Sequence, residues 1–242
     1  MRSLVFLAAP FFLLGCLSLT PSQSTPSLYL IDHPMTLLPE VPEGVEPLAY
    51  GVRVRDVEFP RVLDRNRIVY RHSANRLNYY RYHQWAVPPR TMVSDVLARH
   101  IAAAGIFEEV RRQFIDEQPD LEIRGRLFAL ERLDSGAFGA AHLAMELKLS
   151  RRTDGRVLAH HEFDRETRLH TESMTFFAQT ISRMLEEETA VFLTQVWRAF
   201  DIEPVPSGEE ALSPEESEVD DEGYRLVPLP LERRTHRGDD AS

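Results

Sequence analysis

The hydrophobic residues of this chain follow two periods, and the change between them separates strands from helices. Between residues 48 and 82 apolar and polar residues alternate, which is typical of strands with one buried face. After Pro88-Pro89 apolar residues recur at steps of three and four over 92–104, and Gly105 follows. This pattern predicts a helix that begins at the prolines and ends before the glycine. A second helical period over 173–200 predicts a long helix with one buried face.

The strand-like segments lie on both sides of the first helix. The segment 48–59 is expected to contain a bulge and to end at Pro60, and Asp154-Gly155 is a strong signal for a tight hairpin. Together the elements predict an α+β domain over about residues 46–200, with an antiparallel sheet and two helices packed on one of its faces. The predicted strands are 28–30, 48–59, 67–71, 75–82, 107–110, 121–129, 141–149 and 156–167.

The N-terminus carries a targeting signal. Arg2 precedes an apolar run at 4–14 that is too short to span a membrane and typical of a signal peptide. The run ends in Leu13-Leu14-Gly15-Cys16, which resembles a bacterial lipobox, and Cys16 is the only cysteine of the chain. We therefore expect a signal peptide at 1–15 and a lipidated Cys16. The alternative is an ordinary secretory signal with an incidental cysteine.

The residues after Cys16 indicate where the protein is held. Leu17 stands where an Asp tends to retain such lipoproteins at the inner membrane, so an outer-membrane anchor with the domain in the periplasm is expected. Residues 16–45 are rich in Pro, Ser and Thr, and are predicted to be a flexible tether between the lipid and the domain.

The negative charge of the chain is concentrated in its tail. The net charge is −10, and residues 201–242 hold 13 acidic residues and 4 arginines, which predicts a disordered acidic tail. The remaining chain is almost neutral and shows no outstanding arginine cluster along its sequence. Nucleic acid is therefore not expected as a partner.

The histidines offer one weak candidate for a metal site. On a strand His160 and Glu162 share a face, and His142 could join them if the two strands pair in register. The favoured interpretation is a polar, solvent-facing sheet surface, because neither an HExxH motif nor paired CxxC motifs occur. We predict no metal and no cofactor.

The sequence contains no arrangement typical of catalysis. It lacks GxSxG, and its single cysteine is assigned to lipidation. Residues 135–139 contain glycine but lie between two predicted strands, so a hairpin is favoured over a phosphate-binding loop. The run 186–188 consists of glutamates that point in different directions on a helix and is predicted to be a solvated face. No catalytic residue is predicted, and the chain is not expected to be an enzyme.

An aromatic block precedes the first helix. Tyr80 and Tyr82 are candidates for a partner interface, because tyrosine and tryptophan are typical interface anchors, but edge-strand packing explains them equally well. Trp85 is a third candidate for the same interface, although a core position is favoured for it.

Four stretches in a fixed order resemble a known family. They are 57–65, 68–71, 75–80 and Trp85-Ala86 followed by Pro88-Pro89. In this order, and together with the lipobox, they resemble the ABC-type transport auxiliary lipoproteins, relatives of the paraquat-inducible protein C lipoproteins. The resemblance covers about residues 46–200.

The resemblance implies a non-enzymatic function. Members of the family are outer-membrane lipoproteins that act with MCE-type lipid transporters, in which an MCE protein works with an ABC permease and ATPase to move phospholipid between the two membranes. Some relatives form rings, so a homo-oligomer is a further expectation. Two alternatives remain: a periplasmic carrier with an acyl chain in its own cavity, and a periplasmic hydrolase, against which the missing nucleophile argues.

Overall fold

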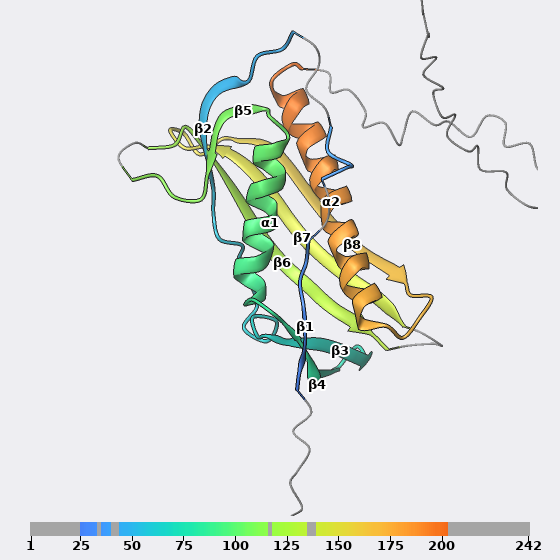
Figure 1. Cartoon of the computed structure of the whole chain (residues 1–242). Helices are drawn as coiled ribbons and strands as arrows, with labels where there is room; N and C mark the ends of the chain where they lie inside the picture. Colours follow the sequence, from blue (N-terminus) through green and yellow to red (C-terminus); the bar gives the residue numbers. More distant parts are fainter. Residues whose placement is uncertain (1–24, 33–34, 40–43, 116–117, 135–138, 203–242) are drawn as a thin grey trace, which may run out of the picture.

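The structure is a computed structural model that describes residues 25–32, 35–39, 44–115, 118–134 and 139–202 (Figure 1). The predicted signal peptide, Cys16 and nearly all of the predicted acidic tail lie outside the described residues. Within them, no helix is long and apolar enough to cross a membrane.

Eight strands form one mixed sheet. Its longest strands, β6, β7 and β8, pair antiparallel in sequence order. One edge of β6 pairs with β2 near the start of β6 and with β3 near its end, and both pairings are parallel. The strands are β1 (Ser27–Tyr29), β2 (Leu48–Val54), β3 (Arg67–Ser73), β4 (Arg76–Trp85), β5 (Phe107–Arg111), β6 (Leu121–Leu133), β7 (Ala140–Arg151) and β8 (Val157–Arg168).

The α+β class is confirmed, whereas the expectation of a sheet that is antiparallel throughout needs correction. Antiparallel pairing holds for β3 with β4, β6 with β7 and β7 with β8. The β1–β4, β2–β5, β2–β6 and β3–β6 pairs are parallel. For β2 and β5 the reason is their connection, which passes through β3, β4 and a helix, because a crossover of this kind returns the chain in the same direction.

Two helices cover one face of the sheet, as predicted (Figure 1). Helix α1 (Pro89–Ala103) begins at a proline, where the missing N–H costs no helical hydrogen bond, and Gly105 follows its end with φ +63°. Helix α2 (Met174–Ala199) is capped by Ser173, whose hydroxyl accepts a hydrogen bond from the Phe176 N–H.

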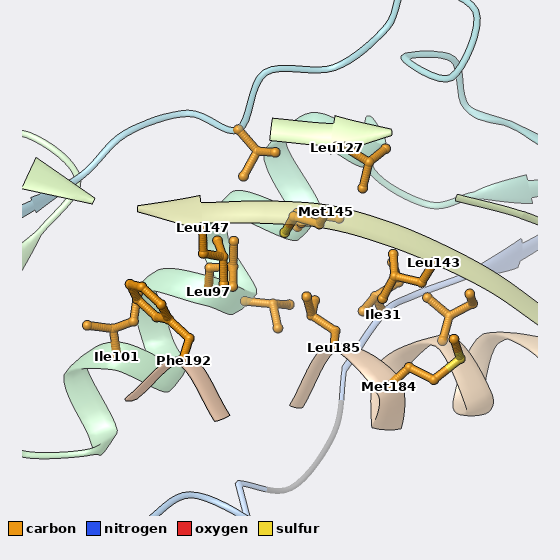
Figure 2. Close-up of a cluster of buried hydrophobic side chains, with 14 of the residues drawn as sticks. Ile31, Leu97, Ile101, Leu127, Leu143, Met145, Leu147, Met184, Leu185 and Phe192 are labelled. Atoms are coloured by element: carbon orange, nitrogen blue, oxygen red, sulfur yellow. The ribbon is translucent and has the colours of Figure 1, made fainter. Parts of the chain in front are cut away.

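The core lies between the helix layer and the sheet. Figure 2 shows Met145 and Leu147 of β7 facing Leu97 of α1 and Phe192 of α2, all of them at most 1% exposed. These residues occupy the positions that the strand and helix periods predicted to be buried.

A segment expected to be flexible belongs to the fold. After β1, the chain passes between α1 and α2 (Figure 1), and we call residues 31–32 and 35–39 the N-terminal strap. Ile31 and Leu38 of the strap are buried in the core. The predicted tether over residues 16–45 is therefore too long, since the fold already begins with β1 at Ser27.

Strand β2 ends earlier than predicted, at Val54 instead of near Phe59. From Arg55 onwards the chain still follows β6, because the N–H groups of Arg55 and Glu58 donate to carbonyls of that strand. Val57 turns its N–H away, to the hydroxyl of Ser94 on α1. This contact with the helix interrupts the ladder.

Candidate interaction surface at the β3–β4 end of the sheet

The aromatic block lies in an irregular part of β4. Arg67 pairs with Gln84 and Val69 with Tyr79, so one residue of β3 stands opposite the four residues 80–83 of β4. Strand β4 therefore bulges here, and the regular alternation of side chains breaks down.

Tyr80 points into the fold. Its hydroxyl donates to the carboxylate of Asp134, at 3.3 and 3.2 Å from the two oxygens, and its ring packs on Tyr70 with 4.4 Å between centroids. Burial raises the pKa of Tyr80 above its usual range, and Asp134 adds to the shift against the opposing effect of Arg132. Tyr80 is a half-buried packing residue.

The aromatic contacts continue from Tyr80 to the N-terminal strand. The rings of Tyr80 and His83 meet edge to face at 5.4 Å, and the Tyr29 hydroxyl lies 2.9 Å from His83 Nδ1. Burial and the positive charge of Arg132 lower the pKa of His83, so neutral His83 can accept this hydrogen bond. The cluster holds β1 against β4.

Of the three residues predicted for a partner interface, only Tyr82 lies mainly at the surface. Its side chain is 44% exposed, whereas Trp85 is 2% exposed and packs against Phe177 of α2 with 6.1 Å between ring centroids. The core interpretation of Trp85 is thus the one that the structure supports. For Tyr82 the partner interface stays a prediction.

Exposed arginines also occur in this part of the fold, and one of them, Arg81, lies over the ring of Tyr82. Arg61 and Arg65 lie on the loop before β3, and Arg67, Arg76 and Arg81 lie on the β3–β4 hairpin. We call these five residues the arginine-rich end. The interpretation that the chain holds no outstanding arginine cluster is therefore wrong in three dimensions.

The sheet face away from the helices carries ion pairs that cross neighbouring strands. Arg71 of β3 donates to Glu131 of β6 at 2.6 Å, and Glu131 lies 3.2 Å from His142 of β7. The other ring nitrogen of His142 lies 2.8 Å from Asp164 of β8. This arrangement matches the predicted polar surface and links four strands.

The environment of His142 predicts how stability changes with pH. The hydrogen bond with Glu131 raises the pKa of His142 despite burial, and Asp164 raises it further. The stabilisation is then complete below the usual histidine pKa and is lost as pH rises through the raised value. We expect the free energy of unfolding to fall by about 1 kcal/mol over this range. In His142→Gln this fall should be absent.

Denaturant unfolding at a series of pH values measures the effect. Glu131 acts in the opposite direction: burial opposes the shift, but hydrogen bonds from His142 and Arg71 lower its pKa. Its contribution is therefore present above the usual glutamate pKa and is lost as pH falls through the lowered value. Parallel profiles for His142→Gln and the parent chain above neutral pH would contradict the assignment.

The candidate metal ligands come together only in part. His160 and Glu162 lie near Glu146, with their ligand atoms within 4.8 Å of one another. His142 is not part of this group, because it pairs with Glu166 further along β8. Glu146 already accepts hydrogen bonds from His160 at 3.0 Å and ion-pairs with Lys148, so the group fits the polar-surface interpretation.

The glutamate run on α2 does not form a solvated face. Glu186 is 0% and Glu188 8% exposed. Glu186 accepts hydrogen bonds from the Thr36 and Leu37 N–H groups of the strap, at 2.6 and 2.9 Å. The prediction failed because the backbone partners of Glu186 come from a segment 150 residues away. Glu188 is satisfied from β8, by His161 and Arg165.

Solved structures share this fold. A crystal structure from Xanthomonas campestris, described with the family DUF330, aligns with a TM-score of 0.61 at 20% identity, covering 72% of this chain and 98% of that one. A crystal structure of an uncharacterized protein aligns with a TM-score of 0.56 at 16% identity, covering 71% and 99%. A PelC dodecamer from Paraburkholderia phytofirmans reaches only 0.38 at 13% identity, covering 63% and 92%, and supports no inference.

These similarities define an α+β domain with two helices over one face of a mixed sheet. The model of the ABC-type transport auxiliary lipoprotein component matches residues 36–191, more than half of the chain. The chain therefore belongs to this family, as its sequence indicated. No protein of curated function matches it.

Proposed function

We propose that the protein is an outer-membrane lipoprotein that serves as a non-enzymatic auxiliary component of an MCE-type ABC transporter for phospholipid. The observation that carries the proposal is the family match over residues 36–191, since the family is a transport auxiliary component. The lipobox ending in Cys16 supports a lipid anchor, and Leu17 after it supports the outer membrane.

The packing of the domain favours an auxiliary role over a lipid carrier. Side chains of both layers fill the space between sheet and helices, and Ile31 of the strap fills part of the groove between α1 and α2 (Figure 2). A carrier would need an apolar cavity in this layer to hold an acyl chain. In the described core, buried apolar side chains of β7, α1, α2 and the strap occupy this layer.

Purification of the full-length lipidated protein from membranes in a mild detergent tests the proposal. Mass spectrometry should recover an MCE protein with its permease and ATPase, and density fractionation should place the protein in the outer membrane. A Cys16→Ser variant should lose the membrane fraction. Recovery of the protein alone, under conditions that preserve such complexes, would contradict the transporter role, and bound lipid in that sample would favour the carrier.

A further inference from the structure

The segment around the β3–β4 hairpin is strongly basic in an acidic chain. Residues 60–90 contain seven arginines and one aspartate, a net charge of +6, while the whole chain carries −10. Asp64, the one acid of the segment, is already paired with Arg90 at 2.8 Å. The segment therefore presents positive charge that its own acids do not neutralise.

The arginine-rich end is free to meet a partner. Its five arginines are exposed, and within the described part of the chain none of them forms an ion pair with a carboxylate. Two of them lie over tyrosines, Arg65 over Tyr79 and Arg81 over Tyr82, with 5.9 Å from each guanidinium to the ring centroid. Elsewhere on the sheet, arginines such as Arg71 and Arg126 are paired with glutamates.

Apolar side chains are exposed on the same strands and loop, and on β1 next to β4. Leu28 of β1 is 63% exposed, Val62 in the loop before β3 is 50% exposed, and Tyr82 is 44% exposed. Arginine together with exposed leucine and tyrosine is the composition of surfaces that lie at a membrane interface, where the cations meet headgroups and the apolar groups enter the boundary with the acyl chains.

The same end of the molecule is the one nearest the lipidation site in the sequence. Strand β1 pairs with residues 83–85 of β4, and ten residues separate Cys16 from Ser27 at the start of β1. Ten residues span at most about 35 Å, even when fully extended. A lipid on Cys16 would therefore hold β1, and with it the β3–β4 hairpin, within reach of the bilayer surface.

We propose that the arginine-rich end, with Leu28, Val62 and Tyr82, docks on the surface of the anionic phospholipid bilayer that holds the lipid anchor. The proposal rests on the lipidation of Cys16 from the proposed function. A bilayer fits better than a protein partner, because the anchor itself brings this end to the membrane and the unpaired cations match a surface of uniform negative charge. Docking would fix the orientation of the domain, with the β7–β8 turn pointing away from the bilayer.

The two ends of β6 provide a matched pair of probe positions. Asn75 in the β3–β4 turn lies near the end of β6, and Thr153 in the β7–β8 turn lies near its start, about 40 Å away along the strand. Because Cys16 is the only cysteine, a cysteine introduced at either position is the single free thiol of the lipidated chain. An environment-sensitive fluorophore on each variant reports contact with lipid.

The experiment uses the lipidated full chain in vesicles of phosphatidylcholine, with or without phosphatidylglycerol. For Asn75→Cys we expect an emission shift with phosphatidylglycerol that is more than about twofold larger than for Thr153→Cys and that decreases at high salt. Adding Arg61→Glu and Arg81→Glu should abolish the shift. Adding Arg111→Glu and Arg156→Glu instead changes the net charge by the same amount at the opposite end of the sheet, and should leave the emission shift intact.

Several results would overturn the proposal. They are equal shifts at both positions, a shift that does not need phosphatidylglycerol, and an N-terminal peptide whose mass shows no lipid on Cys16. A shift at position 75 that occurs only with the purified transporter would assign this surface to a protein partner. The vesicles contain no transporter, so failure of the proposed transporter role would leave the expected shift unchanged. Circular dichroism confirms that the charge variants fold.

Discussion

Glu186→Ala is expected to destabilise the protein by about 3 kcal/mol and to release the N-terminal strap. The carboxylate lies in the helix layer with no exposed surface and accepts the N–H groups of Thr36 and Leu37. Hydrogen bonds to a charged group contribute about 1.5–3 kcal/mol each when buried, and the alanine leaves both donors without this partner. Loss of these two hydrogen bonds also weakens the packing of Leu38, which follows Leu37 directly. Ile31 is affected less, because Ser182 still accepts the N–H of its neighbour Asp32.

Hydrogen exchange distinguishes this local effect from general destabilisation. In Glu186→Ala the amides of residues 31–32 and 35–38 should exchange faster, whereas those of β6 and β7 should follow only the global change. Glu186→Gln retains a neutral oxygen acceptor, and its loss should be intermediate. The neighbouring Glu187→Ala is the matched control: Glu187 pairs with Arg165 and Arg183 near the surface, and its removal should cost less than about 1 kcal/mol. Equal effects at positions 186 and 187 would contradict the role of Glu186.

The secondary structure could be predicted because its signals are local. Pro88-Pro89 and Gly105 delimit α1, and Asp154-Gly155 marks the β7–β8 hairpin, where Gly155 has φ +70°. In β7 the residues that the alternation predicted to be buried, such as Leu143 and Leu147, are buried, and the polar residues between them are partly exposed. These features depend on residues within a few positions of one another, so a single sequence is enough to identify them.

The features that were missed depend on contacts between distant segments. The N-terminal strap shows no sustained helical or strand period along the sequence. Its backbone N–H groups find acceptors on the helices: Met92 of α1, and Ser182 and Glu186, which are spaced one helical turn apart on α2. The bulge of β4 likewise follows from its pairing with β3. It separates Tyr80 and Tyr82, which regular alternation would have placed in the same environment.

The arginine-rich end could have been found from the sequence. A charge count over windows of about 30 residues shows the excess at residues 60–90, whereas a count over the whole body averages it with the acids of other strands. The sequence does not show which of these arginines form ion pairs with carboxylates. Arg71 is paired with Glu131 across two strands, while Arg67 at the start of the same strand has no carboxylate partner among the described residues.

Trp85→Ala is expected to cost about 3–5 kcal/mol of folding free energy, whereas Tyr82→Ala should change it by less than about 0.5 kcal/mol. Trp85 lies where the β1–β3–β4 part of the sheet joins the rest of the fold: its ring packs on Phe177 of α2, while its backbone pairs with Tyr29 and donates to the Asn66 carbonyl. The β3–β6 pairing covers only two residue pairs, so this part of the sheet depends on the tryptophan for its attachment.

Thermal and denaturant unfolding of the two variants measures the difference, and Trp85→Phe, which keeps an apolar ring, should recover most of the loss. Substitution of Tyr82 should affect binding and not stability. Tyr82→Ala should weaken the membrane signal, or retention of the transporter, with unchanged stability. In Trp85→Ala any loss of binding should follow the unfolded fraction, because a side chain that is 2% exposed reaches a partner only after the fold opens. If Trp85→Ala were stable but no longer bound its partners, the core assignment of Trp85 would be wrong and the residue would belong to the partner interface.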